Sequence, residues 1–318
     1  MPGYSGVVPG DISTNIRLDR YAAEYLKLLS RSQVKAKNLE GRINGKPVKI
    51  SRPVKAGDLL ELSWAEPEPA NLIPEDLPLT ILYEDDRVVV INKRQGMVVH
   101  PGAGNYTGTL ANALLWRRVN RDGQDFRSNG TGPRPGIVHR LDKDTSGVII
   151  AAYDDEALAF LANQFKERKT RKTYIAIVKG VPPSPKGRIE NRLIRDPGNR
   201  KRFTVVPPAG PAGKGKAAVT LYRIVRSWDG YSLLLLRPRT GRTHQLRVHL
   251  RHLGCPILGD PIYATADSRF PEATLFLHAK KLTLTLPVAY GHPPEERSFS
   301  APLPPRFREI LAALGKPQ

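Results

Sequence analysis

The hydrophobic positions of the first 64 residues predict a small unit of helices and short strands. Apolar residues recur at helical spacing over 16–29, and a second short helical segment is expected at 32–39. Shorter apolar runs at 42–48 and 57–62 predict strands, and the first of these runs contains an Asn-Gly pair, which is typical of a two-residue hairpin turn. We therefore expect a compact unit that spans 14–64.

The composition changes abruptly after this unit. Prolines alternate with glutamate and aspartate, and no lysine or arginine occurs between Ala65 and Arg87. Proline favours an extended backbone and has no N–H group to donate to a sheet. We predict an interdomain linker at 65–77 and a second, larger domain at 78–318.

The larger domain alternates short apolar runs with turn-forming residues. Strands are expected at 87–92, 147–152, 173–178, 218–225, 231–237, 273–277 and 282–286. Helices are expected at 109–115, at 155–169 after the capping residue Asp154, and at 306–314 after two prolines. Strands outnumber helices and do not alternate with them, so the expected fold class is α+β, with a mixed, mainly antiparallel sheet.

The charge of the chain indicates a polyanionic partner. Fifty Lys and Arg residues against thirty Asp and Glu give a net charge of +20. Nucleic acid is favoured over a membrane surface, because the chain has neither a basic amphipathic helix nor a lipidation signal. A single cysteine, the absence of a signal peptide and the absence of an apolar run near 20 residues lead us to expect a cytoplasmic protein.

One polar stretch at 139–147 gathers charged residues directly before a strand candidate. Its sequence is His-Arg-Leu-Asp-Lys-Asp-Thr-Ser-Gly. If the stretch is extended, the side chains of Arg140 and Asp142 point to the same side, with Leu141 packed behind them. A neighbouring cation favours the ionised carboxylate, which is the form that a nucleophile or a base needs. A charged strand edge or an ordinary Asp/Ser turn is the structural alternative.

A second stretch, at 237–254, concentrates basic residues at the start of a predicted helix. Thr243 can cap this helix, and His244, Arg247 and Arg251 then lie along one of its faces. A helix N-terminus flanked by arginines is also a ready site for an anion. A solvated basic face is the structural alternative.

A third stretch, at 169–178, is the strand candidate in which Lys172 and Tyr174 share one face. An aromatic ring on a strand face can stack on a nucleic-acid base. A tyrosine that only packs in the sheet is the structural alternative.

Neither a nucleotide cofactor nor a metal ion is expected. The loop at 102–108 has the pattern G-x-G-x-x-x-G, and it lacks the acidic residue that would bind a ribose, so a loop that approaches the substrate backbone is the better interpretation. His249, His252 and Cys255 are not accompanied by a C-x-x-C or H-E-x-x-H motif. The chain also has no G-x-S-x-G elbow and no P-loop.

Taken together, three motifs resemble those of the RluA-type pseudouridine synthases. They are G-I-V-H-R-L-D-K-D-T-S-G at 136–147, K-T-Y at 172–174 and G-R-T-H-Q-L-R-V-H at 241–249. The unit at 14–64 resembles the S4-type RNA-binding domain, which points to the branch similar to RluD, acting on large-subunit ribosomal RNA. The resemblance implies the pseudouridine synthase fold and the isomerisation of uridine in RNA without a cofactor or a metal. It implies no obligatory protein partner.

The resemblance also implies roles for individual residues. Asp142 would be the catalytic aspartate, Arg247 its ion-pair partner and Tyr174 the residue that stacks against the target base. Four further residues would bind the substrate nucleotide, namely His139, Arg140, Arg242 and His244.

Two other classes of function stay open at this point. A glycosidase or RNA glycosylase would use Asp142 and Asp144 as a pair of carboxylates, and the glycosylase would release free uracil. A non-catalytic RNA-binding assembly factor would account for the charge of +20 but would leave the pattern around Asp142 and Arg247 unexplained. A change in the RNA that leaves its mass unaltered distinguishes the synthase from both.

Overall fold

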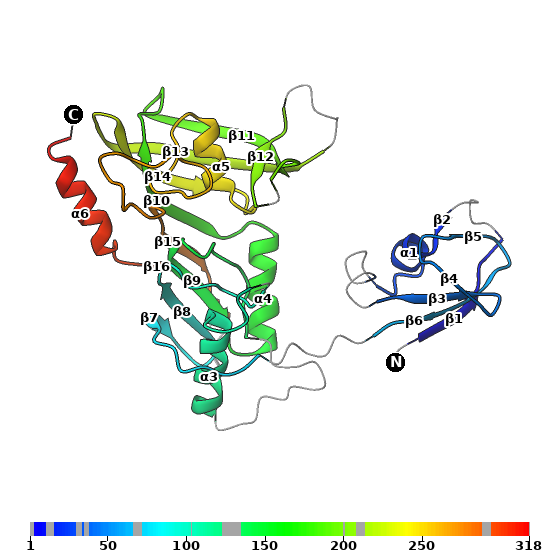
Figure 1. Cartoon of the computed structure of the whole chain (residues 1–318). Coiled ribbons are helices and arrows are strands. Elements are labelled where there is room, and N and C mark those ends of the chain that lie inside the picture. Colours follow the sequence, from blue (N-terminus) through cyan, green and yellow to red (C-terminus); the bar gives the residue numbers. More distant parts are fainter. Residues whose placement is uncertain are drawn as a thin grey trace. The chain divides into compact units, whose positions relative to one another are not determined.

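The computed structural model of the chain shows two compact units, Met1–Asn71 and Leu72–Gln318 (Figure 1). It describes residues 3–10, 16–29, 34, 38–65, 72–102, 104–122, 135–199, 201–207, 214–287 and 294–317. Most of the helical segment expected at 32–39 and the first part of the expected linker lie outside the described residues. No helix within the described ranges is both long and apolar enough to span a membrane.

The first unit is a small antiparallel sheet accompanied by a short helical segment. Its elements are β1 (Gly3–Val7), β2 (Ile16–Arg17), α1 (Leu18–Arg20), the π-helical turn η1 (Tyr21–Tyr25), β3 (Glu40–Ile43), β4 (Lys46–Val48), β5 (Pro53–Val54) and β6 (Leu59–Ser63). The sheet has the order β1-β6-β3-β4, and β2 pairs with β5. The expected hairpin joins β3 and β4 through Asn44 and Gly45, whose φ angles of 52° and 75° are those that a type I′ turn requires.

The helix expected over 16–29 is shorter than its apolar spacing indicates. Ile16 pairs with Val54 in a strand, and the helical segment runs only from Leu18 to Tyr25. Its buried residues pack into the core of the first unit, together with side chains from the sheet. Pairing with β5 therefore overrides helical propensity at the start of this segment.

The second unit is built on one ten-stranded sheet. Its elements are β7 (Thr80–Glu84), β8 (Val88–Lys93), α3 (Leu110–Asp122), β9 (Ser146–Ala152), α4 (Asp155–Lys166), β10 (Arg171–Lys179), β11 (Lys186–Arg195), β12 (Phe203–Val205), β13 (Lys216–Trp228), β14 (Tyr231–Pro238), α5 (Gln245–His252), β15 (Leu277–Thr285), β16 (Glu296–Ser300) and α6 (Pro305–Leu314). The strand order is β12-β11-β13-β14-β10-β15-β9-β8-β7, and β16 pairs with β15. Among the described strands, β15 and β9 alone run parallel, so the prediction of an α+β fold with a mixed, mainly antiparallel sheet is confirmed.

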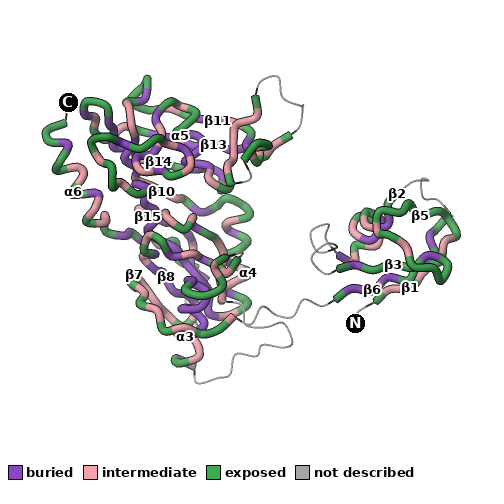
Figure 2. The backbone as a smooth tube through the Cα atoms, in the orientation of Figure 1, coloured by how far each residue is buried: buried purple, intermediate pink, exposed green. Residues whose placement is uncertain are grey.

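Strands β8 and β9 are buried on both faces, which explains their continuous apolar runs. Side chains of β8 alternate between two cores: Val88 and Val90 lie in the core that contains α4 residues, and Val89 and Ile91 lie in the core that contains α3 residues. Figure 2 shows this part of the sheet as a continuous buried zone. The side chain of Asp154 caps α4 by accepting from the N–H of the third residue after it, as predicted.

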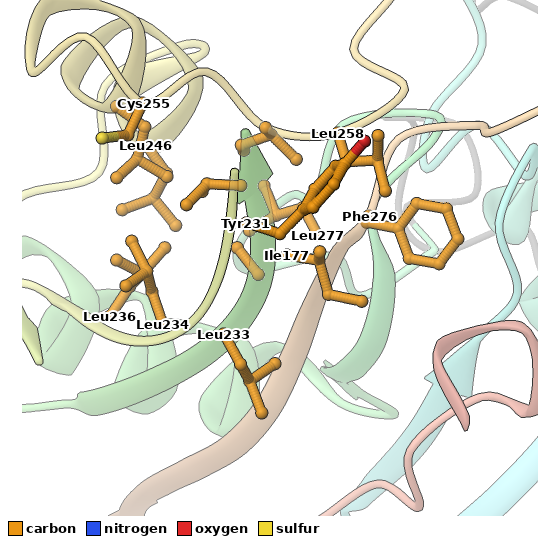
Figure 3. Packing of buried hydrophobic residues seen from close by; sticks show 14 of the residues in the cluster. Ile177, Tyr231, Leu233, Leu234, Leu236, Leu246, Cys255, Leu258, Phe276 and Leu277 are labelled. Atoms are coloured by element: carbon orange, nitrogen blue, oxygen red, sulfur yellow. The ribbon is translucent and has the colours of Figure 1, made fainter. Parts of the chain in front are cut away.

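The remaining half of the sheet has its own core, formed mainly by β10, β14 and the segment that precedes β15. Ile177, Leu234 and Leu236 are fully buried there, and Leu258 and Phe276 pack beside them (Figure 3). Leu246 and Leu250 of α5 belong to the same core, so burial of this apolar face holds α5 against the sheet. This packing sets the position of the residues at the start of α5.

Several predicted boundaries differ from the structure, and the helix expected at 109–115 extends to Asp122 as α3. No strand forms at 273–277, because β15 begins only at Leu277 and continues as one strand to Thr285. Helix α4 ends at Lys166 rather than at residue 169. Residues 73–75, which we placed in the linker, pack against the second unit: Nδ2 of Asn112 donates to the carbonyl of Ile73 at 2.8 Å. The sequence did not predict strands β11 and β16, because both are rich in charged residues and neither contains a continuous apolar run.

Candidate active site

The segment that precedes Asp142 is fastened to strand β9. The N–H of Ala152 donates to the carbonyl of Gly136 at 2.8 Å, and the N–H of Ile150 donates to Nε2 of His139 at 3.1 Å. Gly136 has a φ of +64°, and a Cβ atom there would lie 1.7 Å from the carbonyl oxygen of Ala152. Only glycine fits this close approach, so the glycine and the two hydrogen bonds determine the path of the chain towards Asp142.

Asp142 lies in a turn and not in a strand. The N–H of Thr145 donates to the carbonyl of Asp142 at 3.1 Å, and β9 begins at Ser146. Residues 140–142 belong to no strand, and the chain turns directly after Asp142. Leu141 is buried as expected and packs in the core beside Ile149, which anchors the turn. The side chain of Asp142 stays 22% exposed.

Lys93, at the end of β8, holds the other side of this turn. Its ammonium group donates to the carbonyls of Lys143 at 3.0 Å, Met97 at 2.8 Å and Arg94 at 3.0 Å. The side chain is almost completely buried. Three acceptors satisfy all three of its donors, so this lysine acts as a clamp between two loops.

A cavity of about 610 Å³ opens beside Asp142. Its volume is that of a small-molecule site. All seven residues that the sequence singled out line it: His139, Arg140, Asp142, Tyr174, Arg242, His244 and Arg247. The described residues that line the cavity include Asp142 but not Asp144. The structure thus separates the two carboxylates of the motif.

The carboxylate of Asp142 faces the start of helix α5. Its Oδ2 lies 3.6 Å from NH1 of Arg247 and 3.9 Å from Nε2 of His244. Arg140, which we expected beside Asp142, is exposed and forms none of the ion pairs recorded for Asp142 among the described residues. The cation that pairs with Asp142 therefore comes from a distant part of the chain, helix α5.

Arg247 is held in place by Asp260, a residue that the sequence did not single out. Nε and NH2 of Arg247 each donate to a carboxylate oxygen of Asp260 at 2.7 Å. Asp260 is completely buried in its side chain and also accepts from the N–H groups of Ile262 and Tyr263. Burial lowers the pKa of Arg247, but the hydrogen bond and the charge of Asp260 outweigh it and raise that pKa. The guanidinium is therefore permanently charged and has one defined orientation.

His244 is oriented by Tyr263, which the sequence also missed. Nδ1 of His244 lies 2.8 Å from the hydroxyl of Tyr263, and that hydroxyl accepts from the N–H of Phe203 at 2.8 Å. In the tautomer in which Tyr263 donates to Nδ1, a neutral His244 carries its proton on Nε2, the nitrogen 3.9 Å from Asp142. Burial lowers the pKa of His244, and this effect outweighs the opposing charge of Asp142.

Helix α5 begins at Gln245, and Thr243 is not its cap. The residue before the helix, His244, has a left-handed φ of 55° and makes no side-chain capping bond. The side chain of Gln245 instead fastens the preceding loop: it accepts from the hydroxyl of Thr240 at 2.7 Å and from the N–H of Arg242 at 3.0 Å. The left-handed residue turns the imidazole of His244 out of the helix and towards the cavity.

Tyr174 presents its phenol to the cavity from strand β10, packed against the core that contains Leu141. Burial raises the pKa of the phenol, and the charge of Asp142 adds to this effect, so Tyr174 is a neutral ring at physiological pH. Lys172, two residues earlier, also lines the cavity and lies over the ring of Phe165 at 5.8 Å. Phe165 in turn stacks on His139 with ring centroids 4.4 Å apart. His139 is thus a packing and hydrogen-bonding support of the cavity wall.

The last amide of the glycine-rich loop at 102–108 is bonded to a carboxylate of the same chain. The N–H of Gly108 donates to both carboxylate oxygens of Glu75 at 3.0 Å. A carboxylate at this amide takes the place that a phosphate would need. Within the described ranges, no three His, Cys, Asp or Glu side chains converge as metal ligands.

Comparison with known proteins identifies similar chains. A family model described as RNA pseudouridylate synthase matches residues 87–252. A Borreliella burgdorferi protein named ribosomal large subunit pseudouridine synthase D is 44% identical over 275 residues, which cover 85% of this chain and 82% of that protein. A protein of the same name from Zymomonas mobilis is 41% identical over 78% of this chain and 76% of its own length. The solved structure of human RNA pseudouridylate synthase domain containing 4 aligns with a TM-score of 0.59 and 30% identity over 74% of this chain and 92% of that one.

Proposed function

Because this chain belongs to the family of RNA pseudouridine synthases, we propose that it isomerises uridines of large-subunit ribosomal RNA with Asp142 as the essential catalytic residue. Membership of the family makes the chain an RNA-modifying isomerase. The choice of ribosomal RNA is supported by the names of the Borreliella and Zymomonas relatives and by the charge of +20. The proposed partner is large-subunit ribosomal RNA or the ribosomal subunit, and the proposed location is the cytoplasm.

The observation that supports a catalytic Asp142 is its setting in the cavity. The carboxylate is partly exposed to the cavity and lies 3.6 Å from Arg247, whose own orientation is fixed by a buried carboxylate. Every route for this reaction uses Asp142 as the carboxylate, and the ion pair with Arg247 holds that carboxylate at the cavity. Asp144, the other carboxylate of the motif, does not line the cavity and would not take part.

The reaction exchanges one bond of the uridine for another. The bond between C1′ and N1 breaks, the base turns within the cavity, and a bond forms between C1′ and C5. The proton on C5 is lost and N1 gains a proton, so the mass of the RNA does not change. Asp142 would act by attack on C1′, by addition to the base or by removal of a sugar proton, and in each case as the carboxylate.

The target nucleotide has to leave its stack before it can enter the cavity. Flipping costs a few kcal/mol in a paired RNA, and cations that contact the backbone can offset this cost. Tyr174 would stack against the flipped base, and Arg140, Arg242 and His244 would bind the nucleotide around it. A closed cavity that keeps the detached uracil distinguishes this isomerase from a glycosylase.

The first unit would deliver the RNA. We assign it as an S4-type domain because a short helical segment, flanked by Arg17 and Lys27, is followed by the Asn44-Gly45 hairpin and by the strand β6. Such a domain recognises the shape of structured RNA. The target uridine would then be selected by the combined fit of the RNA to both units.

The test is the conversion of uridine by purified protein. Incubation with a large-subunit ribosomal RNA transcript, followed by carbodiimide mapping, should reveal pseudouridine at defined positions with the wild-type chain. Asp142→Asn should reduce the rate by at least about a hundredfold, the lower range for loss of a positioned acid or base. Asp144→Asn is the matched control and should retain most activity. Free uracil in the reaction, or near-normal turnover by Asp142→Asn, would overturn the proposal.

A further inference from the structure

Strands β11, β13 and β14 present two chemically different faces. Helix α5 lies over one of them (Figure 1): the side chain of Gln245 donates to the hydroxyl of Thr220 at 3.0 Å, and Nδ1 of His249 lies 2.9 Å from the same hydroxyl. Because side chains alternate along a strand, Leu221 and Arg223 point to the opposite side of the sheet. The cavity lies on the same side of the sheet as α5. Tyr174, which lines the cavity, is directly opposite Leu236 of β14, and Leu236 is directly opposite Tyr222 of β13. Tyr222 points to the same side as Thr220, because it is two residues further along the strand.

The opposite face gathers exposed cations in adjacent strands. Lys186 of β11 is directly opposite Arg223 of β13. Arg188 of β11 is opposite Leu221, which is opposite Arg237 of β14. These four cationic side chains, Lys186, Arg188, Arg223 and Arg237, are all exposed, and we call them the outer basic face.

The charges of the outer basic face are largely uncompensated. Arg188 pairs with Glu190 on its own strand at 2.6 Å. The ion pairs recorded among the described residues include none for Lys186, Arg223 or Arg237. Lys186 and Arg223 face each other at the short distance of directly opposed residues, about 5 Å between Cβ atoms, where like charges destabilise a sheet. An arrangement of this kind is stabilised by an external anion.

We propose that the outer basic face binds backbone phosphates of RNA, on the side of the sheet opposite the cavity. This inference rests on the proposed function and specifies its substrate: a long folded RNA that contacts the sheet on both sides, and not a short hairpin that fills only the cavity. A phosphate backbone matches a set of cations spread over neighbouring strands, because each contact contributes by releasing counterions. An acidic protein is the less favoured occupant, because the face has no aromatic anchor among its described residues.

The test compares two double variants of the full chain. Lys186→Gln/Arg223→Gln removes the opposed pair of the outer basic face. Arg308→Gln/Lys316→Gln removes two exposed cations from the C-terminal region and is matched in charge. Binding is measured to a full-length large-subunit ribosomal RNA transcript and to a hairpin of about 20 nucleotides over a series of salt concentrations. The readout is affinity, so it stays interpretable even if the proposed isomerisation fails.

We expect the Lys186→Gln/Arg223→Gln variant to bind the long transcript about tenfold more weakly than the control variant at low salt. The slope of log affinity against log salt should fall by about 2, since each lost duplex contact contributes about 0.9. Affinity for the hairpin should change by less than about twofold. Equal binding of the long transcript by the two variants would overturn the proposal. If RNA binding is unchanged but association with ribosomal particles is lost, the face binds an acidic protein and the RNA assignment is wrong.

A second measurement does not depend on the loss of affinity. Lys186→Cys and Lys316→Cys variants can each carry a tethered Fe–EDTA group, because the native Cys255 is buried. The tether at position 186 should cleave the bound long transcript at discrete sites, and the tether at position 316 should cleave it weakly. Absence of discrete cleavage from position 186 would equally contradict contact between RNA and this face.

Discussion

Arg247 and Asp260 are joined by two parallel hydrogen bonds of 2.7 Å, from Nε and NH2 of the guanidinium to the two oxygens of a fully buried carboxylate. This pairing leaves NH1 of Arg247 directed at Asp142, at 3.6 Å. One arginine therefore connects a structural carboxylate in the core to the proposed catalytic carboxylate in the cavity. The fork geometry of arginine permits this, and the single ammonium of lysine does not.

Removal of Arg247 should impair both stability and catalysis. In Arg247→Ala the carboxylate of Asp260 is left buried without its cation, which costs about 3–5 kcal/mol in comparable buried pairs. Turnover should fall by more than tenfold while RNA affinity changes little, because Asp142 loses the cation that orients it. Thermal unfolding and single-turnover kinetics on saturating RNA measure the two effects.

The double variant Arg247→Ala/Asp260→Ala separates these effects. Removing both partners should restore a large part of the lost stability, because no unpaired charge remains. Turnover should stay low, because NH1 is still absent. Recovery of turnover together with stability would show that Arg247 acts only as a structural residue.

Substitution of Gly136 should displace the segment that leads to Asp142. Gly136→Ala places a Cβ atom 1.7 Å from the carbonyl of Ala152, so β9 and the segment have to separate. Gly230→Ala is the matched control, since Gly230 also has a positive φ, of 71°, but open space around it. We expect the control to lose about 1 kcal/mol of stability, and Gly136→Ala at least about 2 kcal/mol more. Denaturant unfolding tests this, and equal losses in the two variants would contradict it.

Acid should destabilise the protein because buried histidines are held neutral. Burial lowers the pKa of His139 to about 3 and that of His249 and His278 to about 4, against about 6.5 in an unfolded chain. Below pH 6.5 the unfolded chain therefore binds more protons than the folded protein. The stability from these groups is fully present above pH 6.5 and is lost as the pH falls towards 4, and Tm should fall accordingly.

His139→Gln should make this pH dependence shallower. The amide oxygen of glutamine can still accept from the N–H of Ile150, but it takes up no proton. Exposed His252 provides the control, and His252→Gln should leave the fall in Tm between pH 6.5 and 4 unchanged. An unaltered slope in His139→Gln would show that acid acts elsewhere.

Deletion of residues 1–71 should weaken RNA binding and leave the chemistry in place. The boundary between Asn71 and Leu72 keeps the contacts of Ile73 and Glu75 with the second unit, which a cut after residue 77 would remove. The expected result is a raised KM for ribosomal RNA with turnover largely retained at saturation. Complete loss of turnover at saturating RNA, in a variant that melts cooperatively, would contradict the proposed modular roles.

Much of the local structure could be predicted because short-range physical chemistry decides it. The Asn44-Gly45 pair predicted its hairpin, and Asp154 predicted the start of α4. Continuous apolar runs predicted β8 and β9. Predictions failed where tertiary contacts override local preference: Ile16 pairs in a strand despite its helical spacing, and the left-handed His244 displaces Thr243 from the helix start.

The sequence by itself determined which stretches contain the candidate catalytic and basic residues, since the motifs at 139–147 and 241–249 can be recognised one at a time. Only the tertiary structure decided how they combine. It placed Asp142 at the cavity and Asp144 away from it, and it paired Arg247 with Asp260. The sequence around Asp260 shows no local pattern that distinguishes this buried partner of Arg247 from an aspartate at the surface. Its role depends on desolvation and on distances set by the packing of α5 against the sheet.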